Sequence, residues 1–186
     1  MRLARRERSA AERLRREHST LFRRLPDPFH IPTFCDVVSD VVGRPVSAHP
    51  FAKGTFTRFD ACGVNGICVR ADDEFIIGYA GYVPVFHQVV ITLHEAAHIV
   101  CGHLQDIDPG AGLTGAIEIG TPLGNDSAPV RQVLGRSDFR GPQEQTAETL
   151  AILLADRVRQ GALRSTDPRR VAALREFVGP LRNPFG

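Results

Sequence analysis

The pentapeptide His94-Glu95-Ala96-Ala97-His98 constrains the fold of this chain more than any other stretch. It lies inside a mostly apolar run, Val85 to His103, and such a run predicts a buried helix. Residues four positions apart on a helix lie one turn apart on one face, so both imidazoles can reach the same ion, with Glu95 beside them. Because unpartnered polar side chains are costly in an apolar interior, we expect a further partner for these residues.

Two histidines and a neighbouring carboxylate are the parts of a catalytic zinc site. Zinc binds neutral imidazole nitrogens at about 2.0–2.1 Å, and a catalytic site has three protein ligands and one position left for water. Zinc lowers the pKa of that water to about 7, and a carboxylate can accept its proton as the water attacks a carbonyl group. His94 and His98 are therefore predicted ligands and Glu95 the predicted base. The alternative is a chance pattern of polar residues on a half-exposed helix face.

The third ligand is expected on a second helix, which the sequence predicts over residues 142–155. Glu144 and Glu148 lie one turn apart there, and the other face of the helix is apolar. One carboxylate can bind the metal while the other orients a ligand histidine; we assign these roles to Glu144 and Glu148, respectively. The alternative is an exposed acidic pair at a helix start, where the helix dipole favours acidic residues.

Together these residues resemble the motifs of the ImmA/IrrE metallopeptidases. The resemblance covers roughly residues 28–156 and rests on an HExxH helix with a later histidine, followed by a helix of the form E-x-x-A-E/N-x-x-A-x-x-L. The matching residues are His94, Glu95, His98, His103, Glu144 and Glu148. The resemblance implies one zinc ion per chain, bound by His94, His98 and Glu144, with Glu95 as catalytic base. It also implies a cytoplasmic bacterial enzyme that cleaves one protein partner, often a helix-turn-helix repressor.

The rest of the chain predicts an α+β fold. We expect a zincin-like domain whose metal-binding helix pair packs against a small antiparallel sheet, plus an N-terminal helix. A core helix is predicted from Ile31 to Val42, ended by Gly43. Strands are predicted where β-branched and aromatic residues gather, at Thr55–Phe59, Gly66–Arg70 and Glu74–Tyr79.

Three parts of the chain are expected. They are a basic N-terminal helix (residues 1–27), the zincin-like metallopeptidase domain (28–160), and a C-terminal helix with a tail (161–186). Residues 105–140 are rich in Gly, Pro, Asp and Ser, and we interpret them as a loop that controls access to the site.

Charge is concentrated at the start of the chain. Residues 1–24 hold nine arginines and three glutamates, although the net charge of the whole chain is only +2. A thin apolar stripe that includes Leu14 and Leu21 is enough to dock on the domain or on a partner protein, but a solvated helix with a charged face is the favoured interpretation, and direct nucleic-acid binding is disfavoured. No apolar run suits a membrane span or a signal peptide, so we expect a cytoplasmic protein with free thiols. The oligomeric state stays open.

Two further residues precede the HExxH pattern. His87 lies two turns before His94 on roughly the same face, and Tyr82 lies still earlier. Either could donate a hydrogen bond to the transition state or contact the substrate; the alternative for His87 is a capping or core role.

Three functions are compatible with these features. The first is a regulatory zinc endopeptidase that cleaves a specific protein, such as a transcriptional repressor. The second is a non-catalytic interaction protein on the same scaffold. The third is a toxin–antitoxin or stress-response component that uses the same site.

Overall fold

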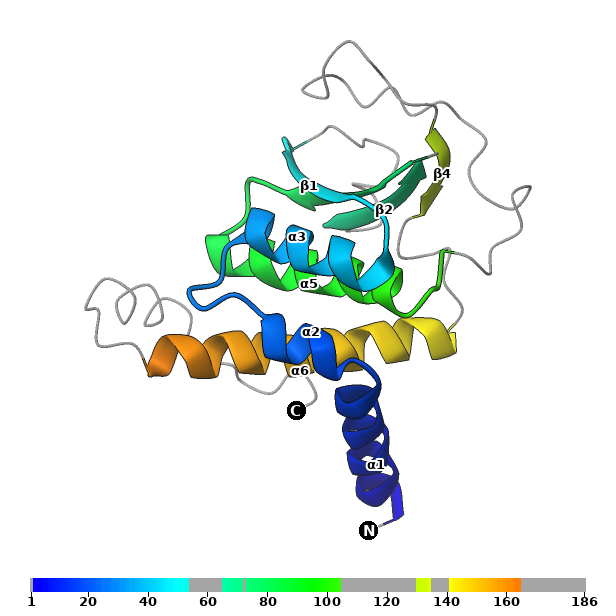
Figure 1. The fold of residues 1–186 in the computed structure, drawn as a ribbon, viewed down its shortest axis with the longest axis vertical. Helices are drawn as coiled ribbons and strands as arrows, with labels where there is room; N and C mark the ends of the chain where they lie inside the picture. The colour runs from blue at the N-terminus through cyan, green and yellow to red at the C-terminus, as the bar shows by residue number, and fades with distance from the viewer. Residues whose placement is uncertain (1, 54–64, 72, 105–129, 135–140, 165–186) are drawn as a thin grey trace.

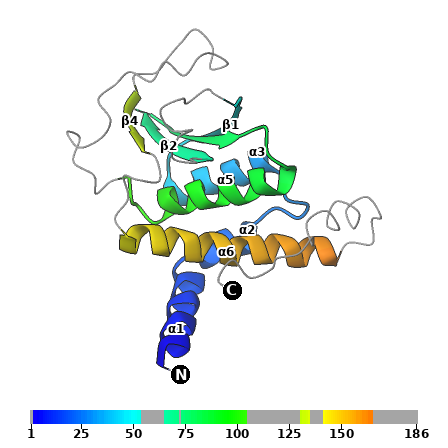
Figure 2. The same cartoon turned by 180° about the vertical axis from the view of Figure 1, so that it is seen from behind.

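The computed structural model describes residues 2–53, 65–71, 73–104, 130–134 and 141–164. It contains a mixed α+β arrangement in layers (Figure 1). The sheet lies on one side of helices α3 (Ile31–Val42) and α5 (Val85–Val100), and α6 (Gly141–Leu163) lies on the other side, with α2 (Ser19–Arg24). The reverse view in Figure 2 shows the same order of layers. Helix α5 is therefore enclosed between the sheet and α6, as its apolar flanks predict.

The sheet has four strands in the order β1-β3-β2-β4. They are β1 (Val46–Phe51), β2 (Gly66–Ala71), β3 (Phe75–Ala80) and β4 (Val130–Leu134). Strand β2 runs antiparallel to β3 and β4, whereas β1 runs parallel to β3. Every residue of β3 is buried, and β3 is an interior strand that lies between β1 and β2.

The prediction of a small antiparallel sheet is confirmed for β2, β3 and β4 but is wrong for β1, which makes the sheet mixed. The parallel strand follows α3 directly: Gly43 caps the helix in a left-handed conformation (φ 70°), and Val46 then pairs with Phe75. Sequence reasoning missed this strand because its Pro50 argues against a strand. Proline is tolerated here because β1 is an edge strand.

The other predicted elements have different outcomes. The helix at 31–42 and the strands beginning near Gly66 and Glu74 are confirmed. The expected strand Thr55–Phe59 and the C-terminal helix lie outside the described residues. Within the predicted loop at 105–140, residues 130–134 form strand β4 at the second edge of the sheet. Helix α6 continues to Leu163, so the expected domain boundary at 160 falls inside a helix.

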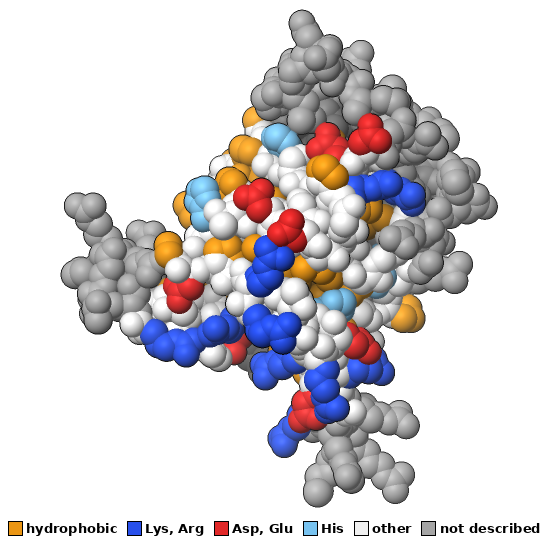
Figure 3. Space-filling view, viewed as in Figure 1, with side chains coloured by type: hydrophobic (Ala, Val, Ile, Leu, Met, Phe, Trp, Pro, Cys, Tyr) orange, Lys and Arg blue, Asp and Glu red, His pale blue; other side chains and the backbone are white. Residues whose placement is uncertain are grey.

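The predicted N-terminal helix is present but is divided at His18 into α1 (Arg2–Glu17) and α2. Leu14 and Leu21 are buried in the main core, so the predicted apolar stripe docks on the domain. Arginines lie on the outside of this region (Figure 3), and two of them, Arg13 and Arg16, form ion pairs with glutamates one turn away. None of the described helices has the length and apolar character that crossing a membrane requires.

Candidate metal centre

Helix α5 places His94 and His98 one turn apart on the face that packs against α6. The helix begins after Pro84, whose fixed φ suits a helix start, and its residues from Thr92 to Ile99 are buried except for His94, which is partly exposed. The Nε2 atoms of the two histidines lie 3.2 Å apart. The prediction that both imidazoles share one helix face is therefore confirmed.

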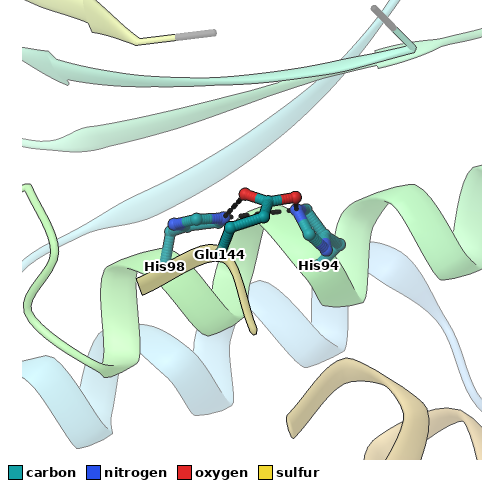
Figure 4. Close-up of side chains that lie close together, drawn as sticks. All are labelled: His94, His98 and Glu144. Atoms are coloured by element: carbon teal, nitrogen blue, oxygen red, sulfur yellow. Dashed lines mark hydrogen bonds and ion pairs between the residues drawn. The ribbon is translucent and has the colours of Figure 1, made fainter. Parts of the chain in front are cut away.

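The third member of the cluster comes from the first turn of α6. Glu144 directs its carboxylate at both imidazole rings (Figure 4). Its Oε1 lies 3.3 Å from His94 Nε2, and its Oε2 lies 3.3 Å from His98 Nε2. The three residues form a group that could hold a metal ion. Packing of α5 on α6 thus brings together the three residues that the sequence predicted as ligands.

The imidazole of His98 is in the form that binds metals. Its side chain is only 1% exposed. Burial, with smaller effects from His94 and His103, lowers the pKa of His98 to about 3. The ring is therefore neutral near pH 7, and a neutral imidazole offers a lone pair to a metal. For the same reason, its contact with Glu144 is not an ion pair at that pH.

His103 contacts the far side of the same imidazole. Its Nδ1 lies 3.1 Å from His98 Nδ1, and both rings are buried. When a metal ion is bound at Nε2 of His98, the proton of the neutral ring is on Nδ1, which can then donate to His103 Nδ1. Such a partner fixes the tautomer and orientation of a ligand histidine. The sequence predicts this orienting role for Glu148, whereas in the structure His103 contacts His98.

The end of α5 explains how His103 reaches this position. Gly102 adopts a left-handed conformation (φ 74°), and its N–H donates to Ile99 O at 3.0 Å. The His103 N–H donates to His98 O, also at 3.0 Å. This pair of bonds is a Schellman ending, which folds the second residue after the C-cap Cys101 back over the last turn of the helix. A glycine one residue before a histidine was the sequence signal that could have identified the contact.

Glu95 lies on the side of α5 that faces the sheet. Its side chain is buried, and its Oε2 lies 2.9 Å from Cys68 Sγ on β2. It nevertheless lines the same pocket as His94. The candidate base and the candidate ligand therefore open onto one cavity.

This pocket has a volume of about 630 Å³ and extends away from the metal cluster between α5 and α6. Its lining runs from His94 back to Phe86 on α5, and from Glu148 to Arg159 on α6. The apolar lining residues are Phe86, Val90, Ile91, Ala151, Ile152 and Ala155. The other lining residues are polar or charged: Asn65, His87, His94, Glu95, Glu148, Asp156 and Arg159. A pocket with an apolar wall and some polar groups is typical of a ligand-binding site.

The remaining predicted site residues lie at the edge of this arrangement. Glu148 is exposed and lines the pocket, and the structure gives it no hydrogen bond within the described part of the chain. His87 is exposed, lines the pocket and lies beside Phe86, with ring centroids 6.0 Å apart. Tyr82 is 43% exposed, packs edge-on against Phe51 and is not among the lining residues. Its predicted contact with the substrate therefore has no geometric support.

Comparison of the chain with family models, with curated proteins and with solved structures found no match. The resemblance to the ImmA/IrrE metallopeptidases therefore stays a prediction. The chemistry of the site has to be argued from its own geometry.

Proposed function

We propose that this protein is a zinc-dependent endopeptidase that acts on a specific protein substrate in the cytoplasm. The observation that carries the proposal is the spacing of the three candidate ligands. Tetrahedral bonds of about 2.0–2.1 Å hold neighbouring donor atoms about 3.3 Å apart. The distances between the His94, His98 and Glu144 donor atoms are 3.2, 3.3 and 3.3 Å.

The donor types also fit zinc. Two neutral imidazoles and one carboxylate are the ligand set of several catalytic zinc sites, with a fourth position left for water. When bound, zinc would lower the pKa of that water to about 7 and polarise a substrate carbonyl. His94 and His98 would each supply a nitrogen lone pair, and Glu144 would supply a negative charge that partly neutralises the ion.

The chain's own residues would supply the acid–base chemistry and the orientation. Glu95 lines the pocket beside His94, where its carboxylate can take a proton from the attacking water and pass it to the leaving amine. His103 would accept the Nδ1 proton of His98 when Nε2 serves as a metal ligand. His87 at the pocket wall is placed to contact the substrate.

The apolar pocket supports a polypeptide substrate. A peptide whose scissile carbonyl lies at the cluster can place a neighbouring side chain between α5 and α6, against Val90, Ala151 and Ile152. We therefore propose that an apolar residue next to the cleaved bond is preferred. A regulatory target such as a helix-turn-helix repressor is the partner that the sequence resemblance suggests.

Metal content tests this function first. Purified wild type and Glu95→Gln are each expected to hold about one zinc ion. His94→Ala and Glu144→Ala should lose it, while Glu148→Gln, one turn along the same helix, is the matched control and should retain it. If no variant, or every variant, holds zinc, the assigned ligands are wrong.

Cleavage tests the second half of the proposal. Zinc-loaded wild type and Glu95→Gln are incubated with a peptide library prepared from a bacterial proteome, and new termini are identified by mass spectrometry. New termini with wild type but not with Glu95→Gln support peptidase activity. If zinc-loaded wild type produces no new termini from peptides or from whole proteins, the peptidase proposal fails, and the protein is a metal-binding scaffold without catalytic activity.

A further inference from the structure

The candidate base Glu95 contacts a residue of the sheet, Cys68, that has no role in the reaction proposed above. Cys68 on β2 places its Sγ 2.9 Å from Glu95 Oε2 and 3.1 Å from the Glu95 backbone oxygen. The Cys68 side chain is fully buried, and Glu95 is only 7% exposed. A buried carboxylate needs partners, and a thiol can donate one hydrogen bond.

The Cys68 thiol keeps its proton for this bond. Burial, and then the neighbouring Glu95 carboxylate, raise the pKa of the thiol well above its usual value. Cys68 is therefore a thiol near pH 7, so that sulfur is the donor and the carboxylate oxygen the acceptor. Its backbone is also fixed, because in the register of the sheet Cys68 lies between Ile77 on β3 and Leu134 on β4.

The first residue of the same strand leaves room for the carboxylate. A Cβ atom on Gly66 would lie 2.5 Å from Glu95 Oε1 and 2.6 Å from Ile91 Cγ2, closer than such atoms approach in proteins. Glycine at this position therefore lets the strand approach α5 closely. Strand β2 therefore suits the Glu95 side chain in two ways: the Cys68 thiol contacts Oε2, and the missing side chain at Gly66 leaves space for Oε1.

We infer that Cys68 is a positioning residue, whose thiol holds the Glu95 carboxylate in one orientation at the pocket while the metal ligands are held separately by α5 and α6. This inference rests on the proposed function, in which Glu95 is the base. A base displaced by about 1 Å can lose about 100-fold in rate. The alternative is that Cys68 only fills space in the sheet, which valine would do equally well.

An infrared measurement tests the contact without any substrate. The S–H stretching vibration absorbs where other protein groups do not, and its frequency falls when the thiol donates a hydrogen bond. The difference spectrum between wild type and Cys68→Val isolates the Cys68 band from those of the other cysteines. In Glu95→Gln this band should move to higher frequency, because a neutral amide is a weaker acceptor than a carboxylate. An unchanged frequency would overturn the inference.

Kinetics test the consequence. On a peptide that wild type cleaves, Cys68→Val should hold about one zinc and keep KM within about twofold, while kcat falls by about 10-fold or more. Cys68→Ser retains a donor and should recover most of that loss. A folded, zinc-loaded Cys68→Val with wild-type kcat would show that the residue only fills space. If wild type holds zinc but cleaves nothing, the proposed function fails, and the infrared result still decides whether the contact exists.

Discussion

Replacing His103 by phenylalanine should weaken zinc binding although His103 is not itself a candidate ligand. Phenylalanine fills a similar space but cannot accept the proton of His98 Nδ1, which His103 Nδ1 approaches to 3.1 Å. Loss of such an outer contact costs about 10- to 100-fold in metal affinity, or about 1.4–2.8 kcal/mol. The metal-free protein should also lose about 1–3 kcal/mol of stability, because the buried Nδ1 of His98 is left without the hydrogen-bond partner that His103 provides.

Competition for zinc with a chromophoric chelator measures the affinity, and urea unfolding of the metal-free protein measures the stability. His103→Asn is the matched variant, because its side-chain oxygen occupies nearly the position of the histidine Nδ1 and can accept the same proton. We expect His103→Asn to bind zinc within a few-fold of wild type. The reasoning is refuted if His103→Phe binds zinc as tightly as wild type, or if both variants weaken binding equally.

Three other perturbations have expected outcomes. In the metal-free protein, burial lowers the pKa of His98 to about 3, so below about pH 6.5 the unfolded chain binds a proton that the folded chain does not. The free energy of unfolding, measured in urea, should therefore fall by about 2–3 kcal/mol from about pH 7 to about pH 4.5. The fall should be smaller in His98→Asn, which lacks the titrating group. Leu154→Ala should lower the free energy of unfolding by about 2–5 kcal/mol, since the side chain is fully buried between α6 and the core; a loss below about 1 kcal/mol would contradict that packing. Ile152→Glu should leave stability nearly unchanged, because the residue is 60% exposed, but should reduce cleavage next to apolar residues by about 10-fold; Leu163→Glu, exposed on the same helix outside the pocket, should cleave as wild type does.

The elements predicted best are those whose pattern is local. Helix α5 and the start of α6 follow from apolar residues at helical spacing, and α3 ends where glycine permits a left-handed residue. Strand β1 was not predicted because it pairs with β3, which lies many residues later in the chain. Its Pro50 argues against a strand, and only the edge position of β1 in the folded sheet makes a proline acceptable there. The N-terminal helix is also divided at His18, and Leu14 and Leu21, on either side of this break, are both buried in the core.

The candidate site divides in the same way. The helical period alone was enough to predict that His94 and His98 lie on one face of α5. Glu144 was predicted as the third ligand because it is a carboxylate on a second helix with an apolar face. The roles of the surrounding residues depended on three-dimensional contacts. His103, and not Glu148, contacts His98, since the Schellman ending at Gly102 returns the chain over the last turn of the helix.

By itself, the sequence determined which side chains α5 presents together, because neighbours one turn apart are set by backbone geometry within a single helix. Only the tertiary structure decided that Glu144 meets both imidazoles, that Cys68 reaches Glu95, and that β1 joins the sheet in parallel. These contacts join residues distant in the chain, and their geometry depends on how the helices and the sheet pack around one core. That packing is a property of the whole set of buried side chains, which no single motif specifies.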